Sequence, residues 1–193
     1  MKKFTKILSF AALTLSLSSC LKDKGYDEFK YGLNQEAAES YKVINMPVGA
    51  TTFTVARTLS KATAGGTATT VTLPLHLSAK DVASENIAVT IASDATRLAT
   101  YNATLAAASR FVQVPDANYT IANGGVATIP SGSRDATITI TYTPNNFPGV
   151  AALTTGSTPL RFAIPVSIKS VDKAGYTISG NQAYRIFTFV INP

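Results

Sequence analysis

The stretch Ala136-Thr137-Ile138-Thr139-Ile140-Thr141-Tyr142-Thr143 decides the fold that the sequence predicts. Its apolar residues alternate with threonines, and in an extended strand this order puts the apolar side chains on one face and the threonines on the other. The same alternation recurs in residues 71–78, 86–92 and 160–168. Residues 183–191 are apolar at both sets of alternate positions, which predicts a central strand covered on both faces. The sequence therefore predicts an all-β domain built on half-buried strands.

Turn residues separate these segments about every ten positions, as in domains built from many short strands. Asn123-Gly124-Gly125 lies between the strand candidates 119–121 and 126–129. Asn and Gly accept a positive φ, so this order predicts a hairpin. Pro130-Ser131-Gly132-Ser133 predicts the next turn, which leads into the Ala136 strand.

Two prolines lie inside predicted strands. Pro74 and Pro165 have no backbone N–H to donate to a strand ladder. We therefore expect edge positions or bulges at both residues. Residues 41–48 and 52–58 are weaker strand candidates at the start of the domain.

One segment breaks the strand pattern. Residues 94–109 lack the alternation, and Asp94 can cap a short helix that ends near Ala103. Leu98 and Tyr101 would then face the domain. The segment predicts a helical crossover between two sheets.

Seven to nine short strands and one small helix indicate an immunoglobulin-like β-sandwich over residues 41–193. The Cys-Trp-Cys pattern of true immunoglobulin domains is absent, because the chain has no tryptophan and one cysteine. The prediction therefore concerns architecture alone.

Residues 1–19 have the pattern of a signal peptide. A lysine-rich start precedes an apolar run at residues 7–17, which is shorter than the about 20 residues that a membrane-spanning helix needs. Leu17-Ser18-Ser19-Cys20 resembles a bacterial lipobox. This resemblance implies cleavage before Cys20 and acylation of that residue. Residues 20–40 would then form a tether from the lipid to the domain.

The charge of the chain does not favour a nucleic-acid partner. The formal net charge is +6, but the basic residues are scattered rather than gathered into one patch. The predicted export of the chain also argues against such a partner. A single cysteine allows no disulfide within the chain.

The order of several segments resembles a known family. These segments are 86–91, 101–102, 111–115, 118–121, 127–133, 136–140 and 162–168. Together with the lipobox they resemble the domain of unknown function 1735, an immunoglobulin-like module near the N-terminus of many Bacteroidota outer-membrane lipoproteins. The resemblance covers about residues 41–191.

That resemblance has consequences for location and role. It implies a lipid anchor in the outer membrane, and it leaves open whether the domain faces the cell surface or the periplasm. In this family the module often precedes a sugar-binding or glycoside-hydrolase domain, and its genes often lie among polysaccharide-use genes. The chain stops at Pro193, so we expect no such partner domain here.

The sequence contains no pattern typical of an enzyme. A Ser-His-Asp or Cys-His site would need His76, the one histidine, which we expect to face solvent from its strand. No cluster supplies the three or four ligands of a zinc site. The carboxylates that a glycosidase pair would need are well spread in the domain; they are Asp81, Glu85, Asp94, Asp116, Asp135 and Asp172. We therefore expect a non-catalytic protein that uses no cofactor and no metal.

Two loop clusters are the candidates for ligand binding. One joins Asn145 and Asn146 to Phe147, and the other joins Asp172 to Tyr176. Each combines an aromatic ring, which can stack on a sugar, with polar groups that can bind its hydroxyls. The alternative is that both are ordinary loops, each with its aromatic ring turned into the domain.

Two functions remain open from the sequence. The first is an accessory or binding module linked to polysaccharide use, with a glycan as partner. The second is a structural or interaction subunit of a surface complex or adhesive fibre, with another envelope protein as partner.

Replacing Cys20 tests the predicted anchor. Cys20→Ala should leave the protein without lipid and outside the membrane fraction, because acyl chains contribute roughly 0.8 kcal/mol per buried CH₂. Labelling with a radioactive fatty acid and membrane fractionation measure both effects. A variant that stays membrane-bound, with no label taken up by the wild type, would contradict lipidation.

Overall fold

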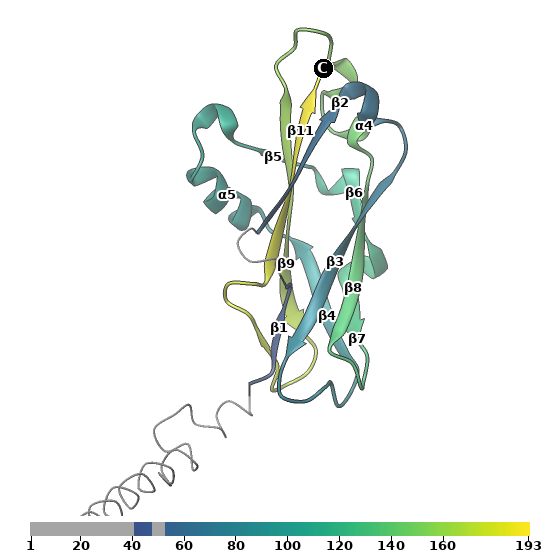
Figure 1. Cartoon of the computed structure of the whole chain (residues 1–193), viewed down its shortest axis with the longest axis vertical. Coiled ribbons are helices and arrows are strands. Elements are labelled where there is room, and N and C mark those ends of the chain that lie inside the picture. Colours follow the sequence, from purple (N-terminus) through teal and green to yellow (C-terminus); the bar gives the residue numbers. More distant parts are fainter. Residues whose placement is uncertain (1–40, 48–52) are drawn as a thin grey trace, which may run out of the picture. The chain divides into compact units, whose positions relative to one another are not determined.

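The computed structural model describes residues 41–47 and 53–193. The predicted signal peptide at residues 1–19, Cys20 and the tether at 20–40 lie outside the described residues. Residues from Lys42 to Pro193 form one compact unit. This unit is mainly β and consists of two curled sheets with a few short helices (Figure 1).

The first sheet has five strands in the order β10-β1-β3-β8-β6. Neighbouring strands are antiparallel, except that β1 and β10 run parallel. The strands are β1 (Val43–Asn45), β3 (Thr69–Ser78), β6 (Tyr119–Ile121), β8 (Asp135–Tyr142) and β10 (Thr177–Ile178).

The second sheet has six strands, five of them in the order β2-β11-β9-β4-β7, while β5 pairs with β9. β2 pairs with β11 and runs parallel to it. The consecutive strands β1 and β2 therefore belong to different sheets. The strands are β2 (Thr54–Ser60), β4 (Ile87–Ser93), β5 (Val112–Gln113), β7 (Val126–Ile129), β9 (Leu160–Val171) and β11 (Tyr184–Asn192).

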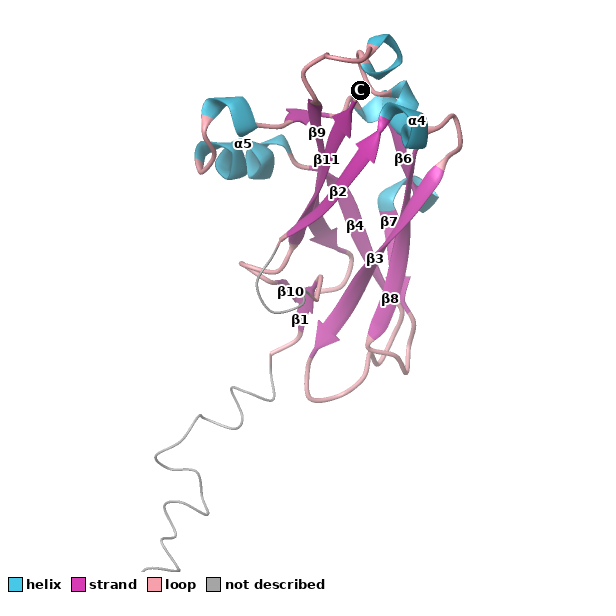
Figure 2. Cartoon of the chain, turned by 45° about the horizontal axis from the view of Figure 1, so that its top comes forward, coloured by secondary structure: helices cyan, strands magenta, loops and turns pink. Residues whose placement is uncertain are grey.

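The helices are short. They are α4 (Lys61–Ala64) and α5 (Ala95–Ala103), with single 3₁₀ turns at Ala107–Ser109, Asp116–Asn118, Ala122–Gly125, Pro144–Asn146 and Val150–Ala152. α5 lies to one side of the strands (Figure 2). In residues 41–47 and 53–193, no helix has the length and apolar character that crossing a membrane requires.

The two sheets enclose one apolar core, and the predicted alternation is confirmed in β3, β4 and β8. In β8, Ile138, Ile140 and Tyr142 are buried while the threonines between them face outward. The opposite sheet contributes Phe162 and Ile164 of β9 to the same core. The predicted central strand is also confirmed, because β11 lies between β2 and β9.

Both prolines lie in interior strands, β3 and β9, and not at the edges of the sheets, but each lies where no described strand pairs with it on one side. Among the described residues, β1 pairs only with residues 76–78 of β3, so no described strand pairs with Pro74 on that side. Pro165 lies between the parts of β9 that pair with β4 and β5. Its carbonyl accepts from the Asp94 N–H at 3.0 Å. The backbone N and C=O of one strand residue point to the same edge of the strand. The Pro165 nitrogen therefore points, like its carbonyl, to the edge between β4 and β5, where no strand needs an N–H donor.

The predicted hairpin at residues 119–129 is wrong. β6 belongs to the first sheet and β7 to the second, so the turn between them carries the chain across the sandwich. The turn does use positive φ at Asn123, Gly124 and Gly125. A Cβ on Gly125 would lie 2.3 Å from the Ile91 carbonyl oxygen, so this close approach requires glycine.

The predicted helix at residue 94 exists, but its predicted role is wrong. α5 joins β4 to β5, and both strands belong to the second sheet, so α5 is not a crossover between sheets. The described residues form eleven strands, so the predicted seven to nine are too few. The prediction missed β5 and β10 because strands of two residues are too short to show an alternation. The weaker strand candidates near residues 41–48 and 52–58 correspond to β1 and β2.

Two adjacent residues of β8 test the burial pattern. Ile140 is fully buried, whereas Thr139 faces outward. Ile140→Ala should lower the free energy of unfolding by about 2–5 kcal/mol, because it leaves a cavity in the core. Thr139→Ala should change it by no more than about 0.5 kcal/mol. Denaturant unfolding of both variants measures the difference, and equal losses would contradict the alternation.

Candidate functional site

The outer face of the second sheet carries α5, which positions the candidate site. Asp94 caps the helix, because its Oδ1 accepts from the Arg97 N–H at 3.3 Å. Leu98 is buried against Ala163 of β9 and Ile186 of β11. The cap fixes where the helix begins, and the apolar contact fixes which of its sides faces the sheet.

The far end of α5 is fixed by a second polar contact. Asn102 donates from Nδ2 to the Phe111 carbonyl at 2.8 Å, and its Oδ1 accepts from the Phe111 N–H at 2.9 Å. The ring of Phe111 stacks on Tyr101 with 6.1 Å between ring centroids. Both ends of the helix are therefore held against the body of the domain.

A cavity of about 330 Å³ lies between α5 and the start of β11, within the about 300–1,000 Å³ typical of small-molecule sites. Its aromatic lining residues are Phe53, Tyr101 and Tyr184. Its polar lining residues are Thr54, Arg97, Thr100 and Thr104, and Ile186 completes the lining. We call this cavity the α5 pocket.

The aromatic rings of the α5 pocket are ordered by one another and by Arg97. Phe53 and Tyr184 stack with ring centroids 4.6 Å apart and planes inclined by 18°. The Arg97 guanidinium lies 4.3 Å from the Tyr184 ring centroid, which is a cation–π distance. Phe53, Arg97 and Tyr184 thus form a stack that three separate segments contribute.

Two of the three threonine hydroxyls that line the pocket already use their protons. Thr100 Oγ1 donates to the Thr96 carbonyl at 3.0 Å, and Thr104 Oγ1 donates to the Tyr101 carbonyl at 2.7 Å. Each hydroxyl oxygen keeps lone pairs that can accept from a ligand O–H. The pocket therefore offers acceptors at its threonines and a cationic donor at Arg97.

The structure corrects the predicted role of Phe147. Its ring is 2% exposed, and it packs on Phe162 and Phe189 with centroids 5.4 Å away in both cases. A ring in the core offers no surface for stacking, so the inward-facing alternative holds. Asn146 is exposed, and Asn145 lines a wider surface hollow of about 620 Å³ near Pro193.

The second predicted cluster lies at the other end of β9. Asp172 accepts the Ala88 N–H at 2.8 Å, and Tyr176 is half-buried beneath Lys42, whose Nζ is 5.0 Å from the ring centroid. Phe147 packs near the start of β9, and Asp172 directly follows its end. The clusters are roughly 30 Å apart at the usual rise per strand residue, so they do not form one site.

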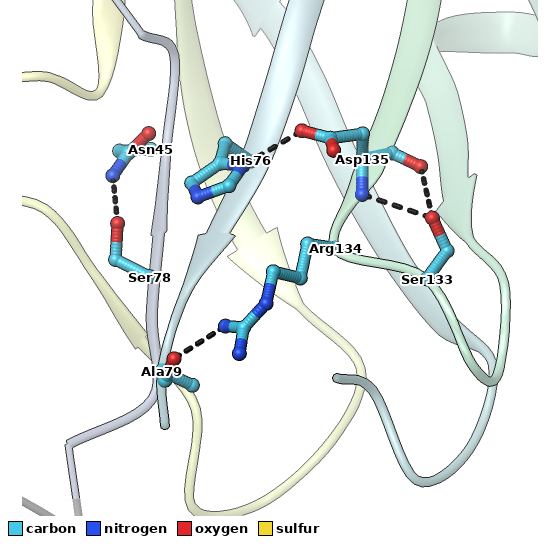
Figure 3. A network of polar contacts seen from close by, with 7 residues as sticks. All are labelled: Asn45, His76, Ser78, Ala79, Ser133, Arg134 and Asp135. Atoms are coloured by element: carbon cyan, nitrogen blue, oxygen red, sulfur yellow. Dashed lines mark hydrogen bonds and ion pairs between the residues drawn. The ribbon is translucent and has the colours of Figure 1, made fainter. Parts of the chain in front are cut away.

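His76 faces outward, as predicted. Its Nδ1 lies 2.7 Å from Asp135 Oδ1, and the two residues are partners across β3 and β8 (Figure 3). Asp135 is held in turn by Ser133, which lies in the turn before β8. In the part of the chain that the structure describes, no group of three His, Cys, Asp or Glu side chains could hold a metal ion.

The fold places the chain in the class of mainly β domains built from two curled sheets. A model of a family of N-terminal domains matches residues 30–175, which is most of the chain. The chain belongs to this family, which is related to the domain of unknown function 1735. A search of curated proteins gave no significant match.

Three solved structures share the fold. A two-domain protein of unknown function from Bacteroides fragilis matches 89% of the chain at 9% identity and a TM-score of 0.57. A proposed carbohydrate binding protein from Bacteroides ovatus matches 78% at 14% identity and 0.53. A multidomain protein including DUF1735 from Bacteroides ovatus matches 78% at 17% identity and 0.52. The chain spans 51%, 37% and 45% of these proteins.

The cap of α5 gives a prediction about stability. Asp94→Ala should cost about 1 kcal/mol in the free energy of unfolding, whereas Asp94→Asn should cost less because asparagine also caps helices. Denaturant unfolding near neutral pH compares the two variants. Equal losses would contradict the capping role.

The same residue predicts a pH dependence. Burial raises the pKa of Asp94, but hydrogen bonds from Lys169 and the Arg97 N–H outweigh it and leave the pKa below its ordinary 3.8. The stabilising effect of the carboxylate is therefore present above pH 3.8 and is lost as the pH falls through the folded value. The difference in unfolding free energy between wild type and Asp94→Asn should shrink at low pH, and a constant difference would contradict this.

Proposed function

We propose that this protein is a lipid-anchored, non-catalytic module of the outer membrane that captures glycan through the α5 pocket. We propose that its two sheets form an immunoglobulin-like sandwich. Two observations support this architecture: β1 and β2 belong to different sheets, and β2 runs parallel to the last strand, β11. The observation that carries the proposal is the ordered stack of Phe53, Tyr184 and Arg97 in a cavity of ligand size.

The chemistry of the pocket suits a saccharide. A sugar ring has an apolar C–H face and a rim of hydroxyls, so it needs a flat apolar surface with polar groups beside it. The stacked rings of Phe53 and Tyr184, together with Tyr101, supply an aromatic wall against which the apolar face of a sugar can pack. Thr100 and Thr104 supply acceptors, and Arg97 supplies donors. Membership of a family related to DUF1735, and a fold shared with a proposed carbohydrate binding protein, support the same role.

The proposal of a non-catalytic role rests on the side chains around the pocket. No carboxylate is among its described lining residues, whereas glycoside hydrolysis by the usual mechanism needs two. His76 and Asp135 lie on the outer face of the first sheet, whereas the pocket lies on the second. Capture without cleavage is what these groups can perform.

The open edge of β2 favours assembly as a second function. β2 is the end strand of its sheet in the described part of the chain, and Val55 to Thr58 are exposed. An extended segment of another envelope protein could pair with this seven-residue edge by strand addition.

Aromatic truncation in the α5 pocket tests glycan capture. Tyr184→Ala and Phe53→Ala should each weaken binding about tenfold, as expected for aromatic residues that dominate a binding site. Affinity electrophoresis of the whole chain in gels containing a broad panel of polysaccharides measures the loss. Tyr176→Ala is the matched control, and it should keep full affinity because Tyr176 does not line the pocket.

Each outcome separates the two functions. Affinity lost at Tyr184 and Phe53, with thermal unfolding close to the wild type, supports capture in the α5 pocket. Affinity lost at Tyr176 instead would move the site to the loop after β9. No binding to any polysaccharide would contradict capture and favour assembly.

A further inference from the structure

The α5 pocket carries a positive charge that no carboxylate of the described residues pairs with. Among the described residues that line the pocket, Arg97 alone is charged. In the same described part, no carboxylate lies within ion-pair distance of its guanidinium. Within residues 41–47 and 53–193, the guanidinium lies over the Tyr184 ring.

The carboxylate nearest in sequence to Arg97 is already neutralised. Asp94 Oδ2 pairs with Lys169 Nζ at 2.8 Å. Its other oxygen, Oδ1, accepts the backbone N–H of Arg97, which is an interaction with the helix cap and not with the guanidinium. Asp94 therefore caps α5 and pairs with Lys169, and it leaves the charge of the Arg97 guanidinium available to a ligand.

A second arginine lies one ring away from the pocket. Arg161 lies over Phe111 with 5.7 Å between the guanidinium carbon and the ring centroid. Phe111 stacks in turn on Tyr101, which lines the pocket. Arg161 thus adds a second positive charge one ring away from the lining of the pocket.

The geometry of Arg97 suits recognition of an anion. A guanidinium that stacks on an aromatic face keeps its in-plane N–H groups free, and these groups form a fork that matches two oxygens of a carboxylate or sulfate. In the α5 pocket the fork lies beside aromatic rings against which a sugar can pack. Arg97 would thus hold the Tyr184 ring in place and bind the anionic group of the ligand.

From these observations we infer that the α5 pocket selects an acidic saccharide, a sugar ring that bears a carboxylate or a sulfate. The sugar packs beside the stack of Phe53, Tyr184 and Arg97, and its anionic group accepts from Arg97. This inference rests on the proposed function, because it specifies which glycan the same pocket binds.

A matched pair of probes tests the inference. Trigalacturonic acid carries three carboxylates, and its methyl ester has the same sugars without the charge. Isothermal titration calorimetry with the whole chain in detergent should give tighter binding of the acid than of the ester, and the difference should shrink with added salt. A sulfated galactan oligosaccharide, measured in parallel, decides between carboxylate and sulfate as the preferred anion.

Variants of Arg97 connect the preference to the pocket. Arg97→Gln should weaken binding of the acid about tenfold or more, because a hydrogen bond to a charged group is lost. It should leave binding of the ester within about twofold. Arg97→Lys keeps the charge but not the fork, and it should give an intermediate loss. The control is Arg110→Gln, which removes the same charge from an exposed residue outside the pocket lining and should change neither affinity.

The outcomes distinguish this inference from the proposed function. Binding of acid and ester with equal affinity, unchanged by Arg97→Gln, would overturn acid selection and leave glycan capture intact. Loss of acid binding in the Arg110→Gln control would overturn the role of Arg97, because it would show a general charge effect. Failure to bind these probes and all neutral polysaccharides would overturn both proposals.

Discussion

Burial of β9 on both faces is the constraint on which the rest of the domain depends. Residues 162–168 are all buried. The inward-facing residues among them, such as Phe162 and Ile164, enter the core between the sheets. On the outer face, Ala163 lies under Leu98 of α5. A strand with two apolar faces requires cover on both sides, and here α5 supplies the outer cover.

The candidate site follows from that cover. A nine-residue helix is too short to be stable alone, so α5 depends on its cap at Asp94 and on the contact of Leu98 with the sheet. The α5 pocket lies where α5 meets the start of β11, and side chains of both elements line it. The contact of α5 with the second sheet therefore also brings Arg97 to Tyr184.

Local pattern predicted most of the strands and the helix but few of the connections. The alternation of β3, β4 and β8 and the Asp94 cap each depend on neighbouring residues, and both appear in the structure. The turn at Asn123 has the expected positive φ but joins two sheets instead of two paired strands. Turn residues determine how sharply a chain bends, whereas the partners of the flanking strands depend on the whole sheet.

The sequence by itself determined that the domain is mainly β, which faces of its strands are apolar, and where α5 begins. It also supplied the motif from which a lipid anchor is predicted. Only the tertiary structure decided that Phe147 is a core residue and that Phe53, Arg97 and Tyr184 meet. The reason is physical: side-chain period and capping act over a few residues, whereas the pocket joins three segments far apart in the chain, whose meeting depends on how sheets and helix pack.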